Sequence, residues 1–340
     1  MNSGHQYVDR TTGAVMQERL LADGWICRLY SPRLENAAWL CRLASSPYTS
    51  RVLGYLNYDN EFASRITGMR RFLQASGINT QELVAPLEEL NTPRKIFERQ
   101  ICYWDCRPLP AGERCVLCPA DARLSLGSIN EHSALFIKNK FFDFDELLGD
   151  GNSRWHTIFK SGDFAVFRLT PEKYHYTHVP VTGRVVDFYS VDGRYHSCNP
   201  AATVQLLHPY SKNRRVVTVL DTDCEGGTAV GHVAMIEIVA LMVGRIDQRY
   251  SECGYENPQP VSKDMFLRAG AAKALFQPGS STVVLLFEPG RILFAEDVLR
   301  HQTRADVCSR YSAVFGSPLC EIDVKVRSSL AHAAGEVAHG

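Results

Sequence analysis

The sequence predicts an α+β protein, in which a helical N-terminal segment precedes a mainly antiparallel, β-rich core. Two observations support this prediction. Before about residue 94 apolar residues recur with a helical period, and after Lys95 short alternating runs are separated by Gly, Pro, Asp and Asn. We therefore expect a helical region over 1–94, a catalytic-sized core domain over 95–327 and a flexible tail over 328–340.

The N-terminal region is expected to hold three helices after a poorly specified leader over residues 1–30. Helical periodicity predicts them over 37–44, 61–76 and 80–90. The second carries an apolar face with arginines beside it, formed by Phe62, Ile66, Met69, Phe72, Leu73, Arg65, Arg70 and Arg71. That face either packs against the rest of the chain, which we favour, or lies on a lipid surface.

The core is predicted from runs rich in β-branched and aromatic residues. The clearest strands are expected over 164–169, 184–189, 216–220, 228–241 (in one or two pieces), 282–287 and 291–294. Between the last two, Pro289 and Gly290 occupy the central positions of a type II turn. These runs predict a sheet-rich domain.

Composition limits the partners and the compartment. Lys plus Arg equals Asp plus Glu at 37 each, so no overall field draws the chain to nucleic acid. No apolar run approaches the ~20 residues that cross a bilayer, and the first ten residues are polar. We expect a cytoplasmic protein with at most a peripheral membrane contact, and a homo-oligomer. Eleven cysteines without a signal peptide favour reduced thiols.

Four of these cysteines match a zinc-binding pattern. Cys102, Cys106, Cys115 and Cys118 form C-x3-C-x8-C-x2-C. The two pairs flank Arg107-Pro108-Leu109-Pro110 and run into a strand-like segment. We therefore favour buried thiols over a structural zinc site and expect no metal.

Three stretches carry residue types suited to chemistry. Asp121 follows Pro119-Ala120, His175 and His178 share the loop 171–180, and Gly279-Ser280-Ser281 forms a turn that leads into the apolar run 282–287. Each has a plain structural alternative: a turn-stabilising aspartate, loop histidines without a chemical task, and an ordinary turn before a strand.

Taken together, Asp121, His178 and a serine at 280 or 281 supply the orienting carboxylate, general base and hydroxyl nucleophile of a serine triad. A Gly-x-Ser-x-Gly elbow is missing from the sequence. The nearest electrophile for such a serine is the backbone carbonyl that precedes it.

In their order along the chain, these stretches resemble the phosphatidylserine decarboxylases, a self-processing, pyruvoyl-dependent family. Pro119-Ala120-Asp121 resembles the family's Pro-Ala-Asp-Gly, and residues 174–180 resemble its Tyr-His-x-x-His-x-Pro. Gly279-Ser280-Ser281-Thr282 resembles its Gly-Ser-Thr or Gly-Ser-Ser cleavage site. Residues 138–148, 198–200 and 213–215 match further blocks, so the resemblance spans about residues 60–325.

The resemblance implies both an activity and a cofactor. The chain would cleave itself near 279–281 into a large β chain and a small α chain, and Ser280 or Ser281 would become a covalent pyruvoyl group. It would then convert phosphatidylserine to phosphatidylethanolamine without pyridoxal phosphate or metal. By resemblance Asp121 and His178 drive the cleavage. His175 is the candidate for binding substrate or protonating the carbanion, with His178 as its competitor.

Some positions depart from the family pattern. Counting from Phe276 selects Ser280 as the nucleophile and counting back from Phe287 selects Ser281, and Gly279 favours the first. Ala122 and Tyr176 are substitutions within the motifs, and residues 271–274 (Ala-Ala-Lys-Ala) replace a Gln-Glu-x-Gly stretch. Two alternatives therefore stay open: a soluble decarboxylase of a free amino acid, and a homologue that never matures and acts by binding.

Overall fold

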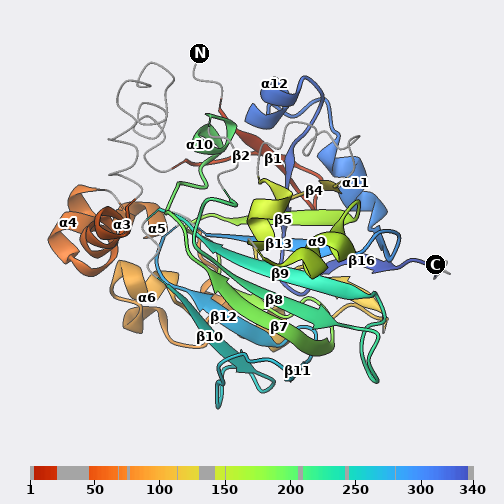
Figure 1. Cartoon of the computed structure of the whole chain (residues 1–340). Helices are drawn as coiled ribbons and strands as arrows, with labels where there is room; N and C mark the ends of the chain where they lie inside the picture. Colours follow the sequence, from red (N-terminus) through yellow and green to blue (C-terminus); the bar gives the residue numbers. More distant parts are fainter. Residues whose placement is uncertain are drawn as a thin grey trace.

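The structure, a computed structural model, describes residues 4–20, 46–67, 69–74, 77–112, 114–129, 142–149, 151–205, 210–241, 245–279 and 281–335. A ten-stranded sheet lies at its centre, and two three-stranded sheets and a set of short helices surround it (Figure 1). The predicted α+β class, with its largely antiparallel core, is confirmed.

The large sheet contains most of the predicted strands. In spatial order its members are β11 (Phe266–Leu267), β7 (Gly183–Val191), β8 (Arg215–Asp221), β9 (His232–Val239), β13 (Ser281–Phe287), β5 (Asp163–Leu169), β4 (Ala122–Ser128), β15 (Glu321–Val324), β1 (Gln6–Asp9) and β2 (Val15–Gln17). Of these neighbours, β1 and β15 run parallel and the other pairs are antiparallel. The strand expected over 228–241 is shorter, because Ala229 and Gly231 take positive φ before β9 begins.

Two small sheets complete the β structure. One has the order β10 (Ile246–Ser251), β12 (Ala272–Phe276), β6 (Tyr176–His178), and the other β14 (Ile292–Phe294), β16 (Ser329–Ala333), β3 (Cys115–Leu117). Between β13 and β14, Gly290 has φ 67°, as the third residue of a type II turn requires.

Both faces of the large sheet are covered. Along β13, Val283 and Leu285 belong to a core that includes residues of the small sheets and the segments beside them. Val284 and Leu286 belong to a second core with the helices α8 (Phe144–Leu148), α9 (Ser153–Phe159) and α12 (Arg310–Phe315). Because both faces of β13 are buried, its sequence is mostly apolar and does not alternate between apolar and polar residues.

The helical N-terminal region is a separate cluster beside the sheets. It contains α3 (Pro47–Gly54), a π-helical turn (Tyr55–Asp59), α4 (Glu61–Ile66), α5 (Met69–Gln74) and α6 (Pro93–Phe97), which Figure 1 shows grouped together. We call this cluster the helical unit. The helix expected over 61–76 is thus divided in two. The segment 37–44 lies outside the described residues.

The apolar residues predicted on one face of that helix are partly buried and partly exposed. Met69 and Leu73 are buried in the helical unit, against Phe97 and its neighbours. Phe62 and Ile66 are 75% and 71% exposed. The two alternatives weighed from the sequence therefore apply to different helices. α5 packs against the rest of the chain, and α4 exposes apolar side chains, as a helix on a lipid surface does.

The prediction of a helix over 80–90 is wrong. Residues Thr80–Glu82 and Leu87–Glu89 form separate 3₁₀ turns, which are joined by an extended stretch. In that stretch Leu83 bridges Ile101, and the Val84 N–H donates to the carbonyl of Gln100 at 3.1 Å. Backbone pairing with a distant segment, together with Pro86, outweighs the local helical pattern. The other short helices are α7 (Tyr103–Cys106), α10 (Pro200–Gln205) and α11 (Glu296–Gln302).

The two ends of the chain also differ from expectation. Within the supposed leader, β1 and β2 extend the large sheet, and within the supposed tail β16 pairs with both β14 and β3. The division into domains stays a prediction, but these described parts are ordered strands. None of the helices in the described residues combines the length and the apolar character needed to cross a bilayer.

Candidate active site

The predicted cleavage turn connects β12 to β13 in the interior. Pro278 and Gly279 are buried, and Gly279 has φ 153°, a conformation that side chains disfavour. Ser281 begins β13, between Leu169 of β5 and Val239 of β9. Its hydroxyl is buried and has no hydrogen-bond partner in the described part of the chain. Ser280 lies outside the described residues.

An unpartnered buried hydroxyl has a cost in folding free energy, because it has lost water and gained nothing in return. Such groups tend to mark places where a reaction or a ligand sets the side chain. The Ser281 hydroxyl, two residues after a glycine with positive φ, is therefore a candidate nucleophile.

His175 lies beside this turn. Its backbone carbonyl accepts a hydrogen bond from the N–H of Phe276 at 3.1 Å, three residues before Gly279. Its ring is fully buried and stacks on Phe97 of the helical unit, with 3.5 Å between ring centroids. Nε2 lies 3.1 Å from the carbonyl oxygen of Thr170, which can only accept, so Nε2 carries the proton.

The other ring nitrogen of His175 is open. Nδ1 has no hydrogen-bond partner among the described residues. Burial, with a smaller contribution from Arg99, lowers the pKa of His175 to about 3. At neutral pH the ring is uncharged and offers one free lone pair, which suits a proton acceptor or a group that binds a substrate proton.

His178 has both ring nitrogens occupied. Nδ1 lies 2.9 Å from the carbonyl oxygen of Gly270 and must donate to it. Nε2 therefore accepts from the hydroxyl of Tyr174, also at 2.9 Å. The Tyr174 hydroxyl lies 2.8 Å from that of Tyr255, which is 2.9 Å from the carbonyl of Ile101. Burial lowers the pKa of His178 to about 4, so the ring is neutral. We call His178, Tyr174 and Tyr255 the tyrosine cluster.

Asp121 is paired with an arginine rather than with His178. Arg107 donates from Nη2 at 2.9 Å and from Nε at 3.3 Å, and the Val326 N–H donates at 2.7 Å. Burial acts to raise the pKa of Asp121, but the charge and hydrogen bonds of Arg107 outweigh it and leave the pKa below its ordinary value. Asp121 is thus ionised, and its side chain is held in place by Arg107 and the Val326 N–H.

The segments that carry Asp121 and His178 are adjacent, since the His178 N–H donates to the carbonyl of Pro119 at 2.8 Å. Within the described residues, however, no hydrogen bond joins Asp121, His175, His178 or Ser281 to another member of this set. The structure brings the predicted residues into one region without connecting them as a triad.

A buried ion pair next to Ser281 was not predicted from the sequence. Lys273 and Glu237 are both fully buried, and Lys273 Nζ lies 2.7 Å from Glu237 Oε2. Gln248 contacts both partners at 2.9 Å, and the Thr177 hydroxyl donates to Glu237 Oε1 at 2.6 Å. We call Thr177, Glu237, Lys273 and Gln248 the ion-pair cluster.

The register of the sheets places this cluster close to the cleavage turn. On β9, Glu237 is opposite Val283 and Val239 is opposite Ser281. Glu237 and Ser281 are therefore diagonal neighbours on one face, about 7 to 8 Å apart. Lys273 is the extra residue of a bulge, because Ala272 pairs with His178 and Ala274 with Thr177. A bulge redirects a side chain, here toward Glu237.

The sequence held one signal for this cluster. A lysine interrupts the otherwise apolar run Ala271 to Phe276, at the stretch where the chain departs from the family pattern. A buried strand tolerates a lysine only when a charge partner is present. Its partner, 36 residues earlier along the chain, could not be inferred from local pattern.

Among the described residues the four cysteines do not gather into a ligand set. Cys115 and Cys118 are buried, and Cys102 and Cys106 are half-buried. The cluster of possible ligands in the described chain is instead His5, Glu18 and Glu321. Arg168 lies 2.8 Å from Glu18 and 2.5 Å from Glu321, so its guanidinium already neutralises both carboxylates where a cation would bind.

Comparison with known proteins agrees with these observations. The family described as phosphatidylserine decarboxylase matches residues 94–311. A phosphatidylserine decarboxylase proenzyme of Chlamydia trachomatis (serovar D) is 30% identical over 301 residues, covering 88% of this chain and 92% of the relative. Those of Chlamydia felis and Chlamydia muridarum are both 31% identical, over 297 and 302 residues, and each is covered to 92%.

The chain belongs to the phosphatidylserine decarboxylase family. The matched region includes Asp121, both histidines of the loop and both serines of the turn.

Proposed function

We propose that the chain is a pyruvoyl-dependent carboxy-lyase that converts phosphatidylserine to phosphatidylethanolamine and carbon dioxide. The observation that carries this proposal is the cleavage turn, where Ser281, two residues after a glycine with φ 153°, has a buried hydroxyl with no hydrogen-bond partner among the described residues. Membership of the family, whose relatives are named proenzymes, supports the same activity.

Self-cleavage would use groups of the chain alone. The serine oxygen attacks the preceding backbone carbonyl, the peptide C–N bond breaks, and an ester forms. Removal of the serine α-proton then expels the upstream carboxylate and leaves dehydroalanine. Addition of water and loss of ammonia give the pyruvoyl group. The upstream residues become the β chain and the downstream residues the α chain.

His175 and His178 would have different roles. His178, with the fixed charge of Asp121 nearby, promotes the cleavage, but its Nε2 must first release the Tyr174 hydroxyl. His175 accepts a substrate proton at its open Nδ1 and can return that proton to the carbanion. Both rings are neutral at pH 7 and so can take up a proton.

The ketone of the pyruvoyl group would hold the substrate amine and withdraw electrons as carbon dioxide leaves. The chain's own residues have the task of positioning that amine. His175 is suited to it, because its ring is clamped by Phe97 on one side and by the Thr170 carbonyl at its edge.

The exposed apolar surface of the helical unit favours a lipid as the substrate. Its outer surface exposes Tyr48, Val52, Tyr55, Phe62 and Ile66. Apolar and aromatic side chains of this kind lie at the boundary of headgroups and acyl chains when a helix rests on a bilayer. The same unit touches the reaction centre, because the ring of Tyr58 contacts Phe97 at 5.4 Å and Phe97 stacks on His175. We propose that the unit rests on the membrane and brings lipid to His175.

The test begins with the intact mass of the purified chain under denaturing conditions, beside Ser280→Ala and Ser281→Ala variants. Two fragments, with cleavage lost in one variant, would support the proposal and identify the nucleophile. A single chain of 38.1 kDa would contradict it and favour the homologue that acts by binding.

The second step separates the substrates. Cleaved protein is incubated with phosphatidylserine vesicles and, separately, with a panel of free amino acids, and carbon dioxide release is followed. Release from vesicles alone supports the lipid enzyme. Release from an amino acid alone would overturn the lipid assignment and leave the pyruvoyl chemistry intact.

A further inference from the structure

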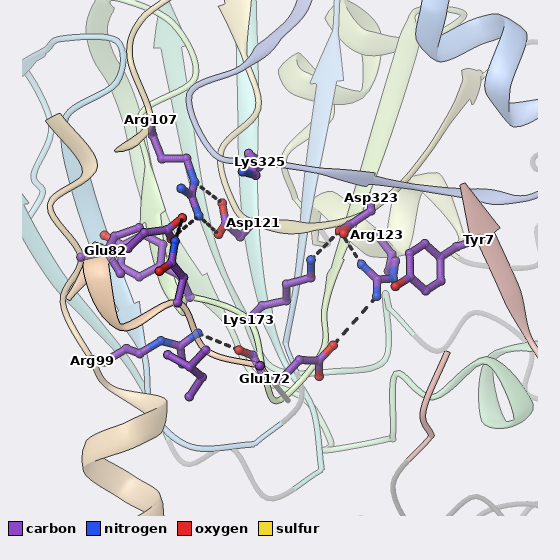
Figure 2. Close-up of a pocket in the computed structure, with 15 residues that line it drawn as sticks. Tyr7, Glu82, Arg99, Arg107, Asp121, Arg123, Glu172, Lys173, Asp323 and Lys325 are labelled. Atoms are coloured by element: carbon purple, nitrogen blue, oxygen red, sulfur yellow. Dashed lines mark hydrogen bonds and ion pairs between the residues drawn. The ribbon is translucent and has the colours of Figure 1, made fainter. Parts of the chain in front are cut away.

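A charged pocket of about 310 Å³ lies beside Asp121, between the helical unit and the start of β4 (Figure 2). Cations outnumber carboxylates in its lining. The cations are Arg99, Arg107, Arg123, Lys173 and Lys325. The carboxylates are Glu82, Asp121, Glu172 and Asp323. The lining therefore carries one net positive charge.

Most of the carboxylates already have a cation partner. Arg107 lies 2.9 Å from Asp121 and 2.9 Å from Glu82. Asp323 is shared between Lys173, at 2.5 Å, and Arg123. These ion pairs hold three of the four carboxylates closely, and the fourth, Glu172, forms a longer ion pair with Arg123 at 3.9 Å.

Two buried arginines are left incompletely satisfied. Arg99 is 7% exposed and donates only to the backbone carbonyls of Ile96 and Glu172, at 2.9 and 2.7 Å. Arg123 is 3% exposed, and its Nε and Nη1 have no hydrogen-bond partner in the described residues, although the guanidinium forms ion pairs with Asp323 and, at 3.9 Å, with Glu172. Figure 2 shows the two side chains reaching the pocket from opposite sides.

A buried guanidinium without an anionic partner is costly, because desolvation of the charge is not compensated. Burial accordingly lowers the pKa of Arg99. Lys325 at the rim is exposed and makes no ion pair within the described chain. An oxyanion in the pocket would compensate these groups together.

The fourth carboxylate limits the charge of such a ligand. Glu172 Oε1 accepts from the Thr170 hydroxyl at 2.6 Å, but Oε2 has no partner in the described residues. An oxyanion with two charges would be repelled by this open oxygen. A singly charged ligand matches the single net charge of the lining.

We propose that this pocket binds a singly charged phosphodiester. Such a group occurs in lipid headgroups and in soluble glycerophosphodiesters. A membrane source is reachable, because Gly77, Ile78 and Asn79 line the pocket directly after α5 of the helical unit.

The pocket borders the predicted site, because Asp121 and Tyr174 are in its lining, but Arg123 does not share a sheet face with the cleavage turn. Arg123 is opposite Arg168 of β5, which is opposite Thr282 of β13. Residues opposite one another share a face of the sheet, so Arg123 and Ser281 lie on opposite faces. The proposal goes beyond decarboxylation, because it names a ligand that need not react.

The test uses a chain that cannot form the pyruvoyl group, the Ser280→Ala, Ser281→Ala double variant. It is titrated calorimetrically with glycerophosphoglycerol, a diester without an amine, which the decarboxylation cannot use. Arg123→Met should weaken binding by about tenfold or more, and Lys325→Met by about threefold. Lys160→Met, an exposed lysine outside the pocket, is the matched control and should bind like the parent.

Absence of saturable binding, or equal affinity in all of these proteins, would overturn the proposal. If Arg123→Met fails to fold, Lys325→Met decides, since that side chain is exposed. The source is identified by co-sedimentation with phosphatidylglycerol vesicles, using phosphatidylcholine vesicles as the reference. Lys325-dependent recruitment indicates a lipid headgroup, and binding of the soluble diester alone indicates a soluble ester. Neither result depends on whether the chain decarboxylates.

Discussion

Strand β6 separates two polar clusters of different character. Consecutive residues of a strand point to opposite sides, so His178 faces the tyrosine cluster and Thr177 faces the ion-pair cluster. The first is uncharged and is linked by hydroxyl groups at 2.8 and 2.9 Å. The second contains a fully buried lysine and glutamate.

The tyrosine cluster can therefore transfer a proton, whereas the ion-pair cluster keeps the strands in a fixed arrangement. Hydroxyl groups and a neutral imidazole can exchange donor and acceptor roles at small cost. A buried ion pair cannot, because removing either charge leaves the other without compensation. We therefore expect the tyrosine cluster to govern the rate of self-cleavage, and the ion-pair cluster to fix β6 against β9 beside Ser281.

The largest effect is expected at His178. His178→Gln retains hydrogen-bonding capacity but removes the base, so self-cleavage should slow by about 10² to 10⁴-fold while the folded state survives. Cleavage is followed by intact mass over time. His232→Gln, at the far end of β9, is the control and should cleave normally. Normal cleavage in His178→Gln would move the base to another residue, with His175 next in line.

Lys273→Met should have the largest effect on stability. It leaves Glu237 charged and unpaired in the interior, which costs about 3 to 5 kcal/mol of unfolding free energy. Denaturant unfolding of the variant and the parent at neutral pH measures the loss.

A second variant distinguishes charge from packing in this cluster. Lys273→Met with Glu237→Gln removes both charges and should recover most of the stability of the parent at neutral pH. If the double variant is as unstable as Lys273→Met alone, the loss comes from packing around the bulge, and the comparison of the two clusters fails.

Acid should destabilise the fold through His178 of the tyrosine cluster. The pKa of His178 is about 4 in the folded chain, against 6.5 when unfolded, and burial is the main cause. A histidine whose folded pKa is lowered stabilises the fold above pH 6.5, and this contribution is lost as pH falls toward 4. At pH 5 the loss is about 2 kcal/mol for this residue. His178→Gln should show a correspondingly flatter profile between pH 7 and pH 5.

Much of the fold could be predicted because its central strands carry their own signal. The runs at 164–169, 216–220 and 282–287 consist mostly of apolar residues, and each is a strand of the large sheet. Strands β1 and β2 have no such signal. β1 pairs with β15, some 300 residues away, and β2 pairs with β1, while Glu18 directly after β2 forms a buried ion pair with Arg168. Contacts of that range have no local pattern.

The residues of the candidate site were proposed from short motifs. Asp121, His175, His178 and the serines each lie in a motif whose order along the chain is distinctive, and their roles stay predictions. The sequence did not indicate which groups these residues contact. Arg107 as the partner of Asp121 and Glu237 as the partner of Lys273 depend on how distant strands align.

Tyr174→Phe tests the tyrosine cluster more gently. It removes the hydrogen bond to His178 Nε2 and makes that nitrogen more available. We expect a stability loss of about 1 kcal/mol and a change in cleavage rate of no more than about tenfold. Tyr103→Phe is the matched control, because the Tyr103 hydroxyl bonds the Gly254 carbonyl and not the imidazole. A changed pH profile of cleavage in Tyr174→Phe alone would assign Tyr174 a positioning role.

The smallest effect on self-cleavage is expected at Thr177, and this variant tests the comparison most directly. Thr177→Val keeps the shape of the side chain and removes one hydrogen bond to Glu237, so the unfolding free energy should fall by about 1 to 2 kcal/mol. Thr218→Val is a matched control: Thr218 is equally buried, and its hydroxyl has no hydrogen-bond partner in the described residues, so its replacement should cost little. If the ion-pair cluster only holds β6 in place, Thr177→Val should cleave itself at the parental rate once measurements are made well below its unfolding temperature. A slower rate in a fully folded Thr177→Val would mean that the two sides of β6 are coupled through the strand, and that the charged side also sets the geometry of the reaction.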